Sequence, residues 1–315
     1  MASVFHYTDT PGLLGILSSE SLFATDYRYL NDTTEAGIIR SLILPILEAE
    51  VAEITPKLIQ KGWLKKDFYD EHGVSGHRLQ AEALYRSIVR AIDNITPFFV
   101  ASFCRHEEGT PAFKHGLLSQ WRGYAESGGF AIEFDEAGLD ERMKEEHDSY
   151  AYVLTKQDSV LYERYDALFD QNIYKGVAGE MIWSVFETQG LDVSEVTGRK
   201  EIDPIILIFI KTAPFLKHWS FKEENEYRIV AACNRARKIP EGEGRPEKSI
   251  QFRSRNNLVT PYIELFDTSQ KRFPIKSIIV GPHPLQDKQA EAVNMVLESE
   301  GIGAEIRLSE IPYRR

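Results

Sequence analysis

The sequence predicts an α+β fold built on a mixed or antiparallel sheet, because strand and helix patterns are intermixed without the regular alternation of a parallel α/β protein. Short apolar runs typical of buried strands occur at 98–104, 130–134 and 226–232. The C-terminal part has the pattern of a βαβ-like unit, with a strand, a helix and a strand over 275–280, 286–299 and 304–308.

Two long helical insertions separate the predicted strands. Residues 33–94 carry apolar side chains at helical spacing, with Pro45 as an interruption. Residues 158–215 form a second stretch of mainly helical spacing. We expect one domain over residues 1–315, in which both insertions are added to the sheet core.

Composition predicts a soluble globular protein, since 43% of the residues are hydrophobic and 27% are charged. No apolar run approaches the roughly 20 residues of a membrane span, and the N-terminus lacks the pattern of a signal peptide. We therefore expect no membrane partner and a cytoplasmic location. Cys104 and Cys233 lie in apolar strand patterns, which predicts buried free thiols.

The formal net charge of −11 argues against a general electrostatic affinity for nucleic acid. A local basic patch stays open as an alternative, at Arg235, Arg237, Lys238, Arg245, Lys248, Arg253 and Arg255. The simpler interpretation of these residues is a solvated loop followed by an edge strand.

The N-terminal segment predicts a strand at 5–8, a helix opened by Thr10 and Pro11, and a second strand at 22–26. His6 then lies beside a helix N-terminus, where free N–H groups and the helix dipole favour a phosphate-bearing ligand. Because side chains alternate along a strand, His6 and Thr8 share a face and together suit a sugar hydroxyl. The simpler interpretation is a packed or capping histidine.

Residues 29–35 contain acidic groups next to a predicted helix start. Asn31 or Asp32 is expected to cap the helix, with Glu35 at the spacing of a capping box. The functional alternative is that Asp32 and Glu35 act as an acid, a base or metal ligands. No standard metal-binding or hydrolase motif accompanies them, so we predict no metal.

The segment 119–124 places Trp121, Arg122 and Tyr124 in a predicted loop that leads into a strand. The two aromatic rings offer flat surfaces for a heteroaromatic ligand, and a guanidinium suits a phosphate. The alternative is that Trp121 and Tyr124 fill the edge of the core while Arg122 pairs with an acid.

Residues 224–228 place two carboxylates and an arginine on one face of a predicted strand, at Glu224, Glu226 and Arg228. Burying a carboxylate pair is costly unless it is compensated, which makes this face a functional candidate. The alternative is an exposed ion pair of little energetic weight.

These segments occur in an order that resembles a widespread bacterial family recorded as a domain of unknown function. The resemblance covers residues 5–314 and rests on the motifs His6-Tyr7-Thr8, Tyr29-Leu30-Asn31-Asp32 with Glu35, Ser119-Gln120-Trp121-Arg122-Gly123-Tyr124, Glu224 to Arg228, Gly281-Pro282 and Ser309 to Arg314. The order of His, Tyr and Glu is in turn similar to that of ADP-ribosyltransferases of the H-Y-E type, which include the DarT-like toxins.

The second resemblance implies that the sheet core, with its helical insertions, has an ADP-ribosyltransferase-like fold, and it implies NAD as the substrate. It implies His6 as the ribose ligand, Tyr124 as the residue that stacks on nicotinamide, and Glu226 as the catalytic carboxylate with Glu224 as its partner. Thr8 and Trp121 complete the expected binding site. Either Arg122 or Arg28 is expected to meet the pyrophosphate.

We therefore expect an ADP-ribosyltransferase-like enzyme or NAD glycohydrolase that cleaves the nicotinamide–ribose bond. It would act on a protein or nucleic-acid acceptor, as a toxin or phage-defence effector in bacterial conflict. Two alternatives stay open. One is a nucleotide-binding sensor module without catalysis, and the other is a metal-dependent nuclease or hydrolase that uses His6, Asp32 and Glu35.

Overall fold

A computed structural model describes residues 2–30, 35–124, 128–162, 170–187, 204–235, 244–255, 257–269 and 272–312. Within these ranges the strands form one sheet in the order β10-β9-β4-β1-β3-β2-β8-β7, and β6 pairs with β3 and with β5. The strands are β1 (Ser3–Thr8), β2 (Leu22–Asp26), β3 (Phe98–Cys104), β4 (Phe130–Asp135), β5 (Tyr152–Ser159), β6 (Glu226–Cys233), β7 (Gln251–Arg255), β8 (Leu258–Leu265), β9 (Ile275–Val280) and β10 (Glu305–Leu308).

The sheet is mostly antiparallel, which confirms the predicted α+β class. The exception is the parallel pair formed by β9 and β10. These two strands are joined by α11 (Gln286–Glu300), so the C-terminal βαβ unit is also confirmed.

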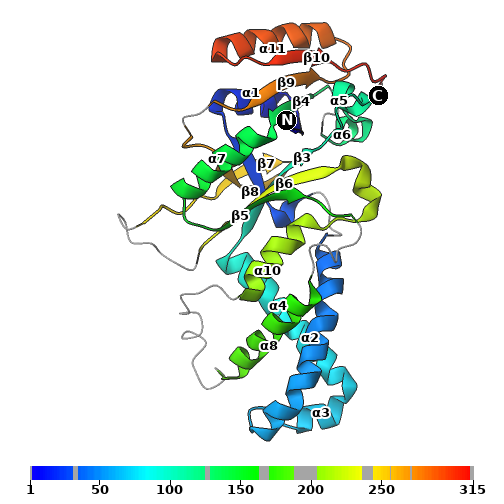
Figure 1. The fold of residues 1–315 in the computed structure, drawn as a ribbon, viewed down its shortest axis with the longest axis vertical. Helices are drawn as coiled ribbons and strands as arrows, with labels where there is room; N and C mark the ends of the chain where they lie inside the picture. The colour runs from blue at the N-terminus through cyan, green and yellow to red at the C-terminus, as the bar shows by residue number, and fades with distance from the viewer. Residues whose placement is uncertain are drawn as a thin grey trace.

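The helices fall into two groups in space. The remaining α-helices are α1 (Thr10–Ser19), α2 (Glu35–Gln60), α3 (Asp67–His72), α4 (Val74–Ile95), α5 (Pro111–His115), α6 (Leu118–Tyr124), α7 (Glu136–Ser149), α8 (Gln171–Glu187) and α10 (Pro204–Thr212). Short 3-10 helices follow at η1 (Tyr27–Tyr29), η3 (Ala213–Phe215) and η4 (Trp219–Glu224). Figure 1 shows α2, α3, α4, α8 and α10 extending together from one end of the sheet, with α11 at the other end.

The two predicted helical insertions pack against each other. Buried side chains of α2, α4, α8 and α10 share one apolar core, to which Leu47, Ile88, Ile182 and Ile210 belong. The second insertion was expected to begin at residue 158, but 152–159 forms β5, which pairs with β6 along its length. Backbone pairing with a buried neighbour therefore outweighs the weak apolar pattern of this polar strand.

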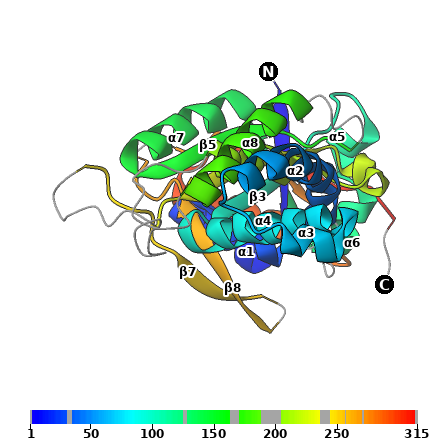
Figure 2. The ribbon, with the colours of Figure 1, turned by 90° about the horizontal axis from the view of Figure 1, so that it is seen from below.

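A second apolar core covers the other side of the sheet. Leu13 and Leu17 of α1, Leu139 of α7 and Leu297 of α11 pack there against strand side chains. The cap of α1 is Asp9 rather than Thr10, since the Asp9 carboxylate accepts a bond from the Gly12 N–H at 2.8 Å. Seen from below in Figure 2, β7 and β8 project from the body as a hairpin.

Cys104 and Cys233 are both buried free thiols, as predicted. None of the helices in the described part of the chain combines the length and the apolar character that crossing a bilayer requires.

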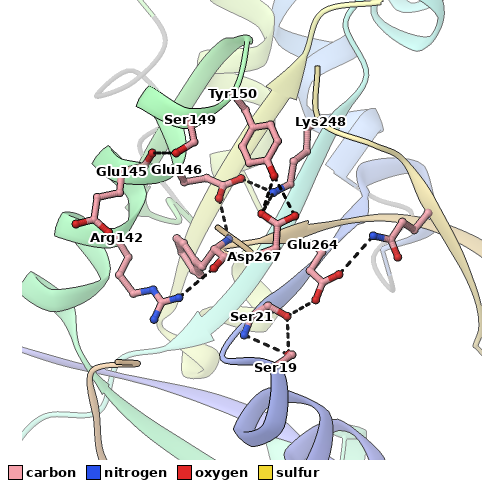
Figure 3. Close-up of polar contacts among 12 residues, drawn as sticks. Ser19, Ser21, Arg142, Glu145, Glu146, Ser149, Tyr150, Lys248, Glu264 and Asp267 are labelled. Atoms are coloured by element: carbon pink, nitrogen blue, oxygen red, sulfur yellow. Dashed lines mark hydrogen bonds and ion pairs between the residues drawn. The ribbon is translucent and has the colours of Figure 1, made fainter. Parts of the chain in front are cut away.

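A buried ionic network ties α7 to the segments on either side of β7 and β8 (Figure 3). The Glu146 carboxylate accepts bonds from the Lys248 ammonium at 2.8 Å, the Tyr152 hydroxyl at 2.6 Å and the Phe266 N–H at 2.8 Å. Lys248 also contacts Asp267 at 2.7 Å. This member of the predicted basic patch is therefore a structural cation.

We predict that Glu146→Gln lowers the free energy of unfolding by about 3 kcal/mol, because it removes a charge partner of the buried Lys248. The control is Glu141→Gln on the exposed side of the same helix, with an expected change of about 0.5 kcal/mol or less. Urea denaturation measures both values. Equal losses for the two variants would contradict this assignment.

Candidate functional site

A cleft of about 660 Å³ lies where β1, α1, β3, α6, η4, β6 and β7 meet. Five residues predicted for the site line it together: His6, Thr8, Tyr124, Glu224 and Glu226. They come from segments that lie up to about two hundred residues apart in the sequence, so it is the sheet topology that brings them together.

The cleft opens where two strands diverge along one edge of β3. β1 pairs with β3 only at Phe5 and Cys104, whereas β2 pairs with β3 at Val100 and Phe99. Between these points, residues 101–103 of β3 pair with neither β1 nor β2. The other edge of β3 pairs with β6 over its whole length, with Ser102 opposite Arg228.

Within this gap, the His6 side chain takes the place of a backbone partner for β3. Its Nδ1 lies 2.9 Å from the carbonyl oxygen of Ser102, and a carbonyl only accepts, so Nδ1 carries the proton and Nε2 is an acceptor. Burial lowers the pKa of His6 below its ordinary value of 6.5, and the charge of Arg253 lowers it further, although the Ser102 bond opposes the shift. His6 is therefore neutral at pH 7.

Glu226 is a buried carboxylate with cationic partners on both oxygens. Arg228 donates from Nε to Oε1 at 2.8 Å and from Nη2 to Oε2 at 3.0 Å, and Lys217 Nζ lies 3.1 Å from Oε2. Burial alone would raise the pKa of Glu226, but the charges of Arg228 and Lys217 outweigh it and hold the pKa at about 2. Glu226 is ionised and its orientation is fixed.

Glu224 differs from Glu226 in keeping an unoccupied oxygen. Its Oε2 accepts from Lys217 Nζ at 2.7 Å, while Oε1 has no hydrogen-bond partner among the described residues. The side chain is 17% exposed and lines the cleft. Glu224 ends η4 rather than lying in the strand, and Asn225 in the left-handed region (φ 42°) turns the chain between the two carboxylates.

The segment 118–124 is a helix, α6, and not the predicted loop. Trp121 is fully buried, donates from its indole N–H to the His115 carbonyl at 3.1 Å and packs edge-on against Tyr7. It belongs to the core, as the structural alternative proposed, and does not line the cleft. Gln120, Gly123 and Tyr124 of the same helix do line it.

The two arginines predicted for the pyrophosphate lie outside the cleft lining. Arg28 donates to both carboxylate oxygens of Asp26 at 2.9 and 2.7 Å, which raises its pKa. Arg122 is exposed on α6. Asn31 and Asp32 fall outside the described residues, as does the side chain of Glu35.

Arg253 and Arg255 of β7 line the cleft instead, in addition to Arg228. Arg253 donates to the Thr25 hydroxyl at 3.0 Å, and its buried Nε has no hydrogen-bond partner. Both arginines of β7 belong to the basic patch seen in the sequence. Their spacing of two residues along a strand, which places them on one face, was the signal that could have indicated a shared role. Sequence reasoning did not assign Lys217, Gln120 or these arginines to the site.

No group of three or more His, Cys, Asp or Glu side chains in the described ranges is arranged to hold a metal ion. The lining of the cleft combines the neutral imidazole of His6 with carboxylates, aromatic rings and arginines. Cationic and anionic groups at separate places suit a ligand that carries both an anionic part and a part where positive charge develops.

We predict that Glu226→Gln lowers the free energy of unfolding by about 3 kcal/mol at pH 7, because Arg228 and Lys217 lose their shared buried partner. The folded pKa of about 2 lies below the ordinary 4.5. The stabilisation by Glu226 is thus complete above about pH 4.5 and is lost as the pH falls towards 2. Denaturation of wild type and variant from pH 7 to pH 3 should show the difference shrinking. A difference that is constant with pH would contradict the ionic assignment.

The family model described as "Protein of unknown function (DUF2971)" matches residues 120–229. The matched range begins at Gln120 and ends just after Arg228, so it contains the α6 wall of the cleft together with both carboxylates. Neither the curated proteins nor the solved structures that were compared with the chain include a match.

Proposed function

We propose that this chain binds NAD in the cleft and cleaves the bond between nicotinamide and ribose, as an ADP-ribosyltransferase-like enzyme. One observation carries the proposal. The histidine, the aromatic residue and the two carboxylates that the H-Y-E resemblance names all line the same cleft. The cleft volume of about 660 Å³ is also within the usual range of ligand sites.

His6 is suited to hold the ribose. Its Nε2 is an acceptor because Nδ1 is committed to the Ser102 carbonyl, and an acceptor of this kind binds a sugar hydroxyl. Thr8 follows two residues later on the same strand and also lines the cleft. The pair holds the sugar in one orientation while its bond to the base is broken.

The carboxylates supply the charge that the reaction needs. When the C–N bond breaks, its electron pair leaves with the nicotinamide nitrogen, and positive charge develops on the ribose as in glycoside hydrolysis. Glu224 faces that charge with its unpaired oxygen, and Glu226 fixes Lys217, which in turn orients Glu224. An acceptor hydroxyl then bonds to the anomeric carbon and gives up its proton, which Glu224 accepts.

Arg253 and Arg255 are the candidates for the pyrophosphate. From the sequence, Arg122 or Arg28 was expected to bind the pyrophosphate, but neither lines the cleft. A guanidinium binds phosphate oxygens through paired N–H groups, and the Nε of Arg253 is buried without a partner. The acceptor is a protein or a nucleic acid, and water in its place gives an NAD glycohydrolase.

A second function is nucleotide binding without turnover, and one observation favours it. Both oxygens of Glu226, the residue expected to be catalytic, are already engaged by Arg228 and Lys217. Under this alternative the pocket would be retained as a sensor. The two functions differ in whether Glu224 takes part in chemistry.

We predict that wild-type protein releases nicotinamide from NAD and that Glu224→Gln lowers this rate by about 100-fold or more, because a charge that stabilises the transition state is removed. NAD should still bind, and the free energy of unfolding should change little because Lys217 keeps its ion pair with Glu226. Nicotinamide release is followed by chromatography, with protein, nucleic acid and cell lysate as acceptors.

The matched control is Glu223→Gln, an exposed neighbour on η4 that does not line the cleft. It should keep the wild-type rate. NAD binding by the wild type without any nicotinamide release would favour the sensor function, and the absence of both binding and release would end the proposal.

A further inference from the structure

We propose that Gln120 and Tyr124 form a recognition subsite for a planar ring that carries a hydrogen-bond donor beside an acceptor. Both residues lie on α6 and both line the cleft. The identity of the ligand tested here rests on the proposed function, whereas the subsite itself rests on the geometry of α6.

The helix is fixed so that these side chains face the cleft. Trp121, which lies between them in the sequence, is fully buried, contacts Tyr7 and donates to the His115 carbonyl. Residues four apart lie side by side on a helix, so the carboxamide of Gln120 and the ring of Tyr124 are neighbours. Gly123 of the same helix also lines the cleft, and a Cβ added there would meet nothing within 4 Å.

Gln120 has a mostly buried side chain whose carboxamide makes no hydrogen bond within the described part of the chain. The residue is 5% exposed and lines the cleft. Buried side-chain amides are normally hydrogen-bonded, because removing them from water without a partner costs free energy. The Gln120 carboxamide is therefore available to a ligand without the loss of a hydrogen bond within the protein.

The chemistry of the pair selects one class of ligand. A carboxamide offers a donor and an acceptor side by side, and it matches a second amide or the edge of a nucleobase. Tyr124 is 38% exposed and supplies a ring face on which a planar heterocycle stacks. A planar heterocycle with such an edge contacts both groups at once, so the subsite takes the base of a nucleotide.

NAD carries this chemistry at both ends, in the carboxamide of nicotinamide and in the edge of adenine. Two analogues separate them. Nicotinic acid adenine dinucleotide replaces the carboxamide by a carboxylate, and nicotinamide hypoxanthine dinucleotide replaces the amino group of adenine by a carbonyl. Each analogue changes the hydrogen-bonding pattern at one end only.

The experiment measures the Kd values of NAD and both analogues by calorimetry in the Glu224→Gln background, where turnover is suppressed. With Gln120 intact, one of the analogues should bind about tenfold or more weakly than NAD, because a buried polar group is left unpaired. Gln120→Met keeps the length of the side chain without its polar atoms, and should bring that ratio to within about twofold of one. Gln171→Met on the exposed surface of α8 serves as control and should leave all ratios unchanged.

The outcomes separate this inference from the proposed function. Discrimination that depends on Gln120, without nicotinamide release by the wild-type protein, supports the subsite and rejects the enzyme. Nicotinamide release with the same discrimination in Gln120→Met rejects the subsite and supports the enzyme. Binding that is equal for the three dinucleotides, or no binding of any of them, overturns the subsite.

Discussion

The split of the sheet along one edge of β3 is the constraint on which the candidate site depends. If one strand paired with β3 along the whole of this edge, backbone pairing would fill the space that is now the cleft. Instead β1 leaves β3 after the contact between Phe5 and Cys104, and the Ser102 carbonyl accepts a bond from the His6 side chain. A gap in the ladder thereby sets the tautomer of the histidine and its direction.

The same strand positions the charged residues from its other edge. Pairing of β3 with β6 places Glu226 opposite Cys104 and Arg228 opposite Ser102. Glu226 is buried only because Arg228 and Lys217 compensate its charge, since an uncompensated buried carboxylate would be neutralised or excluded. Lys217 is shared with Glu224. The structural ion pair therefore holds the second carboxylate at the cleft, with one oxygen available.

Much of the fold could be predicted from local patterns. The runs that became β3, β4 and β6 are apolar enough to predict buried strands. The βαβ unit near the C-terminus follows from the change between strand and helix periodicity along the sequence. The packing of two distant helical insertions into one core could not be predicted, because helical periodicity says which face is apolar but not what covers it. The helical state of 118–124 depends on burial of Trp121, which is a tertiary effect in a segment too short to be helical by itself.

The sequence predicted several of the residues that line the cleft, but it predicted less well what each residue does. His6, Tyr124 and Glu226 were named from order and residue type, and their convergence required the sheet. Arg28 was expected at a phosphate, but Asp26, two residues earlier, already binds its guanidinium. Arg253 lines the cleft because β7 follows β8 at the edge of the sheet, a pairing of segments that local sequence does not specify. Gln120 was missed because its neighbours Trp121 and Tyr124 carried the more conspicuous signal.

The most direct test is a crystal structure of the Glu224→Gln variant with NAD bound. The account predicts a dinucleotide in the cleft, with a ribose hydroxyl within hydrogen-bonding distance of His6 Nε2 and its anomeric carbon facing residue 224. A dinucleotide bound elsewhere, or an orientation that turns the ribose away from His6 and β6, would contradict it.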